Sequence, residues 1–215
     1  MKPLIVTGTD TGVGKTVVAA MLTLALDGIY WKPIQSGVAD GTDTKTVAAL
    51  TGLGPAHFRP ERYVLREPLS PHRAAELDGV EIDASELALP RDAPDGKWLI
   101  IEGAGGVLVP IRRDLLQVDL FARWQAPIVL CARTALGTIN HSLLSIEALR
   151  GRNLKLLGIV FVGDENKDTE RTIVEFGGLR GLGRLPPLKR LDRQTLMAAF
   201  DAGFDRRDFE ATYGG

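Results

Sequence analysis

A glycine-rich segment near the start of the chain combines a lysine and a threonine with the backbone that anion binding needs. The apolar run 4–6 leads into residues 8–16, and a helix-like run follows from Val17. Glycines let the backbone curl so that successive N–H groups face one anion, and the helix start adds the positive end of its dipole. Lys15 would reach the β- and γ-phosphates of a nucleotide, and the Thr16 hydroxyl would ligate Mg²⁺.

This segment departs by one position from the strict Walker pattern, which places a glycine six residues before the lysine. Thr9 stands at that position, and Gly8 lies one residue earlier. The triplet Gly14-Lys15-Thr16 and the order of strand, loop and helix are intact. We therefore favour a phosphate-binding loop over a glycine-rich turn that happens to precede a helix.

Two acidic residues stand where magnesium ligands belong. Glu102 ends the apolar run 98–101 and opens a glycine-rich stretch, and Asp43 begins a helix-like run. Mg²⁺ takes oxygen ligands, usually one or two carboxylates together with phosphates and water. In open parallel sheets, ligands bind beyond the carboxyl ends of the strands, where Glu102 is expected. For Asp43, a simple helix cap or a first-turn acid is an equally good interpretation.

Lys32 follows the short strand-like run 29–31 and opens the segment 32–37. A lysine that leaves a strand at the carboxyl edge of a sheet can add positive charge where a phosphoryl group is transferred. A solvated surface lysine is the alternative, and the residues around it do not decide between the two.

The elements that must position these residues alternate between strand and helix. The runs 4–6, 98–101, 127–130 and 156–161 are apolar on both faces, as in parallel strands covered by helices on both sides; weaker strands are predicted at 29–31 and 183–185. Helices are predicted at 16–26, 43–50, 138–150 and 168–175. This alternation predicts an α/β fold with a doubly wound, mostly parallel sheet and helices on both faces.

The sequence predicts a single domain over residues 1–215, with two less regular parts. Residues 55–97 contain several prolines and no continuous strand pattern, and we expect an elaborated crossover with one helix that begins at Ser70-Pro71. Residues 193–215 predict a C-terminal helix and a tail.

Composition excludes several classes of protein. The net charge of −1 gives no overall attraction to nucleic acid or to a membrane surface. The single cysteine, Cys131, lies in an apolar run and cannot form an intramolecular disulfide or a cysteine metal cluster, so a buried structural thiol is expected. No apolar run approaches the roughly 20 residues that span a bilayer. We therefore expect a cytoplasmic protein that binds neither nucleic acid nor membranes.

Four segments together resemble one family. Residues 7–16, 32–37, 102–106 and 137–141 are similar, in order and spacing, to the dethiobiotin synthetases, and the offset Walker glycine is the form that this family uses. The resemblance runs from residue 3 to about 187. It implies a P-loop NTPase fold and a homodimeric, ATP- and Mg²⁺-dependent cyclo-ligase. Such an enzyme carboxylates 7,8-diaminononanoate with CO₂ and closes the ureido ring to give dethiobiotin, ADP and phosphate, by way of a carbamate and a carbamic-phosphoric anhydride.

The resemblance also implies roles for individual residues. Around the transferring phosphoryl group it places Lys15, Lys32 and Thr11, and as magnesium ligands it gives Thr16, Asp43 and Glu102. The remaining nucleotide-binding residues are expected to be Gly12, Val13, Gly14, Val17, Gly103, Ala104 and Gly105. For the diamine or its carbamate it gives Ser36, and for the substrate carboxylate, across the dimer interface, the helix start formed by Gly137, Thr138, Ile139 and Asn140.

Two positions depart from the family pattern. Gly12 stands where many members carry an acidic residue near the substrate amines. Val162 stands where the family has an asparagine that reads the adenine base. The second departure predicts relaxed base selection, so that other nucleoside triphosphates can replace ATP.

The alternative function is a P-loop ATPase switch of the chromosome-partitioning type. That class shares the sheet and an offset loop, but its loop normally carries a second lysine ahead of the Gly-Lys-Thr triplet. Residues 9–13 contain no lysine, and the segment 32–37 has no role in such a switch. These differences favour the ligase.

Overall fold

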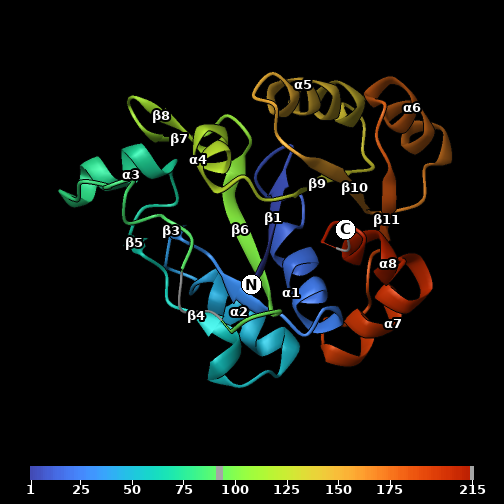
Figure 1. The fold of residues 1–215 in the computed structure, drawn as a ribbon, viewed down its shortest axis with the longest axis horizontal. Helices are drawn as coiled ribbons and strands as arrows, with labels where there is room; N and C mark the ends of the chain where they lie inside the picture. Colours follow the sequence, from blue (N-terminus) through green and yellow to red (C-terminus); the bar gives the residue numbers. More distant parts are fainter. Residues whose placement is uncertain (91–93, 214–215) are drawn as a thin grey trace.

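A seven-stranded sheet forms the centre of the molecule (Figure 1). The structure is a computed structural model that describes residues 1–90 and 94–213. The strands lie in the order β11-β10-β9-β1-β6-β2-β4, and every pairing among them is parallel. Their bounds are Lys2–Gly8 (β1), Ile29–Trp31 (β2), Phe58–Arg59 (β4), Trp98–Gly106 (β6), Ile128–Arg133 (β9), Leu156–Val162 (β10) and Gly181–Leu185 (β11).

Helices cover both faces of this sheet, as Figure 1 shows. One face packs against α1 (Lys15–Ala25), α2 (Asp43–Thr51), α7 (Arg193–Gly203) and α8 (Arg206–Glu210), and the other against α4 (Gln117–Trp124), α5 (Thr138–Arg150) and α6 (Lys167–Gly177). The predicted doubly wound α/β fold is therefore confirmed.

The central strand β1 shows why its sequence is continuously apolar. Leu4, Ile5 and Val6 are all fully buried. Side chains alternate between the faces of a strand, so Ile5 enters the core beneath α4 and α5, whereas Leu4 and Val6 enter the core beneath α1. A strand with helices on both sides has no solvent-facing positions left for polar residues.

All the predicted helices and strands are present, with ends that differ by a few residues. The structure also contains several short elements that the sequence did not predict. Helix α4 and the short strands β3 (Ile34–Ser36), β4, β5 (Tyr63–Leu65), β7 (Pro110–Arg112) and β8 (Leu115–Leu116) were not predicted. Strands of two or three residues are too short to show a period, and α4 has only eight residues. Residues 55–97, where the sequence shows no continuous strand pattern, thus contain β4 and β5 as two short strands.

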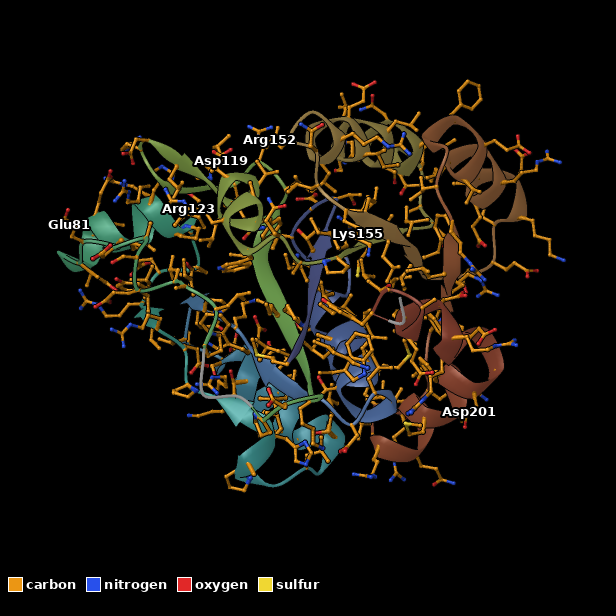
Figure 2. The ribbon with its side chains drawn as sticks, viewed as in Figure 1. Glu81, Asp119, Arg123, Arg152, Lys155 and Asp201 are labelled. Carbon is orange, nitrogen blue, oxygen red and sulfur yellow. The ribbon has the colours of Figure 1, made fainter. Side chains whose placement is uncertain are left out.

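Helix α4 is stabilised by contacts at its start and along its side. The Asp119 carboxylate accepts a hydrogen bond from the backbone N–H of Leu116 at 3.1 Å, which satisfies one of the free donors at the helix start. Its other oxygen accepts from Nε of Arg152, just beyond α5, at 2.8 Å (Figure 2). The pair ties α4 to the end of α5, on the face of the sheet that both helices cover.

The less regular parts of the chain also carry defined structure. Helix α3 (Pro71–Asp78) begins after Ser70, as expected, and places Pro71 at the first helical position. At the C-terminus, α7 and α8 are followed by Tyr213, whose ring meets Trp98 edge to face with 5.5 Å between centroids. Residues 91–93 of the expected crossover and 214–215 of the expected tail lie outside the described residues.

The edge strand β11 meets the C-terminal helices at a glycine. Gly183 has φ of +141° and bridges Phe204. A Cβ at this position would lie 2.2 Å from the carbonyl oxygen of Gly203 and 2.7 Å from the Phe204 ring. Only a glycine therefore allows the end of α7 to pack this closely on the sheet.

Gly183→Ala should lower the free energy of unfolding by about 1–3 kcal/mol, because the methyl group must displace backbone in a packed contact. Gly54→Ala is the matched control, since Gly54 has φ of −75° and no atom within 4 Å of an added Cβ. Urea unfolding measures both variants, and equal losses in the two would contradict this account of the contact.

Candidate active site

A cleft of about 560 Å³ opens at the carboxyl end of the sheet, next to the glycine-rich loop after β1. Its walls come from the loop and the start of α1, the segment after β2, the start of α2, the segment before α3, and the end of β6. The lining residues are Thr11, Gly12, Gly14, Lys15, Thr16, Val17, Lys32, Gln35, Ser36, Asp43, Pro68, Leu69, Ser70, Pro71, Glu102, Ala104, Gly105 and Val109. Most of the residues that the sequence singled out therefore meet in one place.

The loop owes its shape to glycines at two kinds of position. Gly12 and Gly14 have φ of +71° and +94°, in the left-handed region that other residues rarely adopt. Gly8 has no such conformation, but a Cβ there would lie 2.5 Å from the Val13 side chain and 3.1 Å from that of Lys15. The glycine one residue ahead of the Walker position is thus required by packing inside the loop.

Lys15 lies folded over this loop. Its ammonium donates a hydrogen bond to the carbonyl oxygen of Asp10 at 2.9 Å, and the residue is only 6% exposed. Burial lowers the pKa of Lys15, while the carboxylate of Glu102 opposes that shift. A buried ammonium with one carbonyl partner is ready to exchange that partner for an anionic oxygen.

Glu102 is the centre of a buried polar network. The residue is 1% exposed. Its Oε1 accepts from the Thr16 hydroxyl at 2.9 Å and from the Lys32 ammonium at 3.0 Å, and its Oε2 accepts from the Tyr30 hydroxyl at 2.8 Å. Burial, with the Glu102 carboxylate second, raises the pKa of Tyr30 well above its usual value, so the phenol remains a donor.

Lys32 lies between two carboxylates. Its ammonium contacts Asp43 as well as Glu102, and the residue is 6% exposed, so the alternative of a solvated surface lysine is wrong. Burial acts to lower the pKa of Lys32, but the two carboxylates outweigh it and the net pKa is raised. The two carboxylates therefore favour the protonated, cationic form of Lys32.

The same arrangement tests whether a magnesium ion fits. The carboxylates of Asp43 and Glu102 meet at one cation, the Lys32 ammonium, and the Thr16 hydroxyl donates to the same Glu102 oxygen that contacts Lys32. Hard oxygen donors of this kind suit Mg²⁺, which takes its other ligands from phosphates and water. Among the described residues, no group of three or more His, Cys, Asp or Glu side chains is arranged to hold a metal. The residues therefore fit an ion that a nucleotide helps to bind.

Asp43 is not the cap of its helix. Thr42 is the N-cap residue of α2, and its side chain accepts a hydrogen bond from the Lys45 backbone at 3.3 Å. The backbone N–H of Asp43 donates to Oε1 of Gln35 at 2.9 Å, which leaves the Asp43 carboxylate to face Lys32. Thr42 therefore takes the capping role that was left open for Asp43, whereas the other alternative, a first-turn acid, is confirmed, because Asp43 is the acidic residue in the first turn of α2.

Three supporting residues were missed by the sequence analysis. Gln35 fixes the start of α2 and donates to the carbonyl oxygens of Ser36 and Gly37. Gln117, at the start of α4, contacts the backbone of the glycine-rich end of β6. Tyr30 contacts Glu102 from the neighbouring strand. Gln35 and Tyr30 lie close to Lys32 in the sequence, but the position of Gln117 carries no recognisable pattern.

Two groups of predicted site residues lie outside the cleft. The side chain of Val13 is buried against Gly8 inside the loop, and Gly103 packs against Gln117. The helix start 137–140 does not line the cleft of its own chain; Gly137 and Thr138 line a separate hollow of about 160 Å³ with Asp10 and Arg133. The hydroxyl of Thr138 is buried there without a hydrogen-bond partner among the described residues.

Cys131 has the environment expected of a structural thiol. It is fully buried in β9, and burial raises its pKa to about 12. A thiol that stays protonated and inaccessible is a poor nucleophile.

Comparison with known proteins assigns the family. The family described as "AAA domain" matches residues 2–195. A protein from Rhodopseudomonas palustris (strain TIE-1) named ATP-dependent dethiobiotin synthetase BioD is 59% identical over 206 residues, which cover 96% of each chain. A protein of the same name from Nitrobacter hamburgensis is 58% identical over 207 residues, again covering 96% of each chain. The chain belongs to the dethiobiotin synthetase family. The resemblance stated from the sequence is thereby confirmed.

Solved structures place this dethiobiotin synthetase family member among the P-loop ATPases in fold. The septum site-determining protein MinD from Pyrococcus horikoshii, a complex with Mg-ADP, has a TM-score of 0.56 and 12% identity, covering 92% of this chain and 86% of that one. A ParA family ATPase from Chlorobium tepidum has a TM-score of 0.50 and 13% identity, covering 98% and 96%. At such identities the likeness shows the fold alone, and it adds nothing to the chromosome-partitioning alternative.

Lys32→Ala should lower the free energy of unfolding by about 3 kcal/mol, because it leaves two carboxylates, one of them buried, without their cation. The control is Lys97→Ala, whose partner Asp27 is exposed, and which should cost less than about 1 kcal/mol. Urea unfolding at neutral pH without nucleotide gives both values. Equal effects would mean that the Lys32 network is not a buried ion cluster.

Proposed function

We propose that this protein is an ATP-dependent dethiobiotin synthetase. It carboxylates 7,8-diaminononanoate with CO₂ and closes the ureido ring, with release of ADP and phosphate. The observation that carries the proposal is the convergence of Lys15, Lys32, Thr16, Asp43 and Glu102 in one cleft of a chain with this family membership. The names of the relatives support the use of ATP and the product, and the reaction steps are those that the family resemblance implies.

The residues of the cleft suit phosphoryl transfer to a carbamate. One substrate amine captures CO₂, and the carbamate oxygen attacks the γ-phosphorus, so negative charge grows on the phosphoryl oxygens. Lys15, Lys32 and the loop backbone around Thr11 would stabilise that charge, and preorganised cations are effective in a site with little water. The second amine then attacks the carbamic-phosphoric anhydride, expels phosphate and closes a five-membered urea, without any side-chain nucleophile.

A magnesium ion would be held by Thr16, Asp43 and Glu102 together with the phosphates. When bound, it would neutralise charge on the β- and γ-phosphates. Lys32 contacts both carboxylates, so its ammonium would become available to the transferring phosphoryl group if they held the ion. Through their backbone N–H groups, Gly12, Val13, Gly14, Val17, Gly103, Ala104 and Gly105 stay candidates for nucleotide contacts.

The diamine is expected beyond the phosphates. Ser36 lines the cleft, and its hydroxyl is buried without a hydrogen-bond partner among the described residues. A buried orphan hydroxyl is costly unless a ligand satisfies it, which favours contact with the diamine or its carbamate. An added Cβ at Gly12 would meet no atom within 4 Å, so the position where many relatives carry an acidic residue is open space here.

A homodimer would bring the remaining substrate contact. The helix start of Gly137, Thr138, Ile139 and Asn140 stands apart from the cleft of its own chain. Residues 9–11 of the loop line a groove of about 480 Å³ together with residues of α5. Leu108, Leu136 and Leu144 around this region are 50%, 107% and 57% exposed. Exposed apolar side chains at one place mark an interaction surface, which supports the dimer.

The domain organisation and the cellular location belong to the same proposal. We assign the whole chain to one ligase domain, with 55–97 as the crossover that brings Pro68 to Pro71 to the cleft. No helix in the described part of the chain is long and apolar enough to cross a membrane. A cytoplasmic location, without nucleic-acid or membrane partners, stays a prediction.

Phosphate release should depend strictly on the diamine and bicarbonate. With purified protein, Mg²⁺ and ATP, a phosphate assay and mass detection of dethiobiotin should give a stoichiometry of one phosphate released per dethiobiotin formed.

Lys15→Ala should lower turnover at least about a hundredfold, because a cation at the transferred group is lost. The control is Lys155→Ala, at the amino end of β10, where the ammonium contacts only the Thr212 carbonyl among the interactions described. ATP hydrolysis that runs equally fast without the diamine would overturn the ligase.

Base selection should be weak. Val162 packs against the loop: a Cβ added to Gly14 would lie 2.9 Å from Cγ1 of Val162. The Val162 side chain has no group that could form a hydrogen bond with a base. We expect kcat/KM for ATP, CTP and GTP to agree within about a hundredfold, since only a site that hydrogen-bonds a ligand rejects close analogues more strongly. Val162→Asn, of similar size, should raise the preference for ATP. A wild-type preference for ATP above that limit would contradict the prediction.

A further inference from the structure

The carboxylate of Glu102 is held from two opposite sides. On the cleft side, Oε1 accepts from the Thr16 hydroxyl and the Lys32 ammonium. On the core side, Oε2 accepts from the Tyr30 hydroxyl alone, among the hydrogen bonds of the described residues. The two partners on the cleft side line the nucleotide site, whereas Tyr30 does not line the cleft.

The partners on the cleft side have other tasks when nucleotide binds. In the proposed function, Thr16 turns its oxygen to the metal and Lys32 its ammonium to the phosphoryl group. Both hydrogen bonds to Oε1 are then given up or reshaped. The Tyr30 hydroxyl is the remaining support of the carboxylate, since nothing in the proposed reaction engages it.

Tyr30 is built to hold its hydroxyl in one place. It lies in β2, fully buried, with its backbone in register between Ile100 of β6 and Phe58 of β4. Glu102 follows two residues after Ile100, on the same face of the sheet, and a diagonal neighbour of this kind is within reach of a long side chain. The Phe58 ring meets the Tyr30 ring edge to face, with 6.5 Å between centroids.

We propose that Tyr30 is a positioning residue of the metal site: its hydroxyl holds the Glu102 carboxylate in the orientation that binds Mg²⁺ with the nucleotide. The role rests on the proposed function, because it requires a magnesium ion at Glu102. Residues that hydrogen-bond a metal ligand from behind fix its orientation and raise the affinity for the ion.

The test is Tyr30→Phe, which removes one oxygen and keeps the ring that fills the core. Isothermal titration calorimetry would measure the Mg²⁺ concentration that half-saturates the ADP complex, together with the affinity for ADP without metal. We expect Mg²⁺ to bind about tenfold more weakly, as is usual for loss of such a supporting bond, with metal-free ADP affinity unchanged. The control is Tyr63→Phe, whose hydroxyl contacts Glu86 and Asp83, residues that do not line the cleft.

A second variant separates positioning from simple loss of stability. If Tyr30 acts through Glu102, then Tyr30→Phe should add no further loss of Mg²⁺ affinity in a Glu102→Gln background, although the unfolding temperature falls in both backgrounds. Equal Mg²⁺ affinity in wild type and Tyr30→Phe, or an equal loss in both backgrounds, would overturn the role of Tyr30. If wild-type ADP binding does not respond to Mg²⁺ at all, the metal site of the proposed function fails, and the role of Tyr30 fails with it.

Discussion

Charge buried at the carboxyl edge of the sheet is the constraint on which the rest of this structure depends. Glu102 is 1% exposed and Lys32 is 6% exposed. Removing two opposite charges from water costs several kcal/mol for each ion, so they are tolerated only with good mutual geometry and with further hydrogen bonds. Here those bonds come from Thr16 of α1 and Tyr30 of β2. The pairing of β2 with β6 and the packing of α1 on the sheet are therefore required to keep the Glu102 carboxylate hydrogen-bonded.

The phosphate loop depends on a second constraint, which is steric. Gly8 must lack a side chain because Val13 and Lys15 pack over it, and Gly14 must lack one because Val162 of β10 packs against it. The loop is thus held by its own residues and by a strand two positions away in the sheet. A loop with little freedom presents its N–H groups without the cost of ordering them on binding.

The sequence identified the parts of the site that follow simple rules. Long apolar runs marked the strands, and Glu102 and Lys32 at their ends were expected at one edge of the sheet. Register was not predictable: Tyr30 and Glu102 lie 72 residues apart, and only the pairing of Tyr30 with Ile100 brings them together. The same holds for Gln117, since α4 is too short to be seen in a periodic pattern.

Similar folds occur in ATPases that are only 12–13% identical to this chain, so the fold by itself does not decide the function. In this chain the additional cation, Lys32, follows strand β2, next to Ser36 and to the walls where a second substrate would lie. In the proposed function, a metal ion bound by Asp43 and Glu102 would leave this ammonium to the phosphoryl group, beside the space for the second substrate. One short segment, from Lys32 to Ser36, would thus provide both the additional cation and a wall of the space for its acceptor, which the shared sheet alone does not provide.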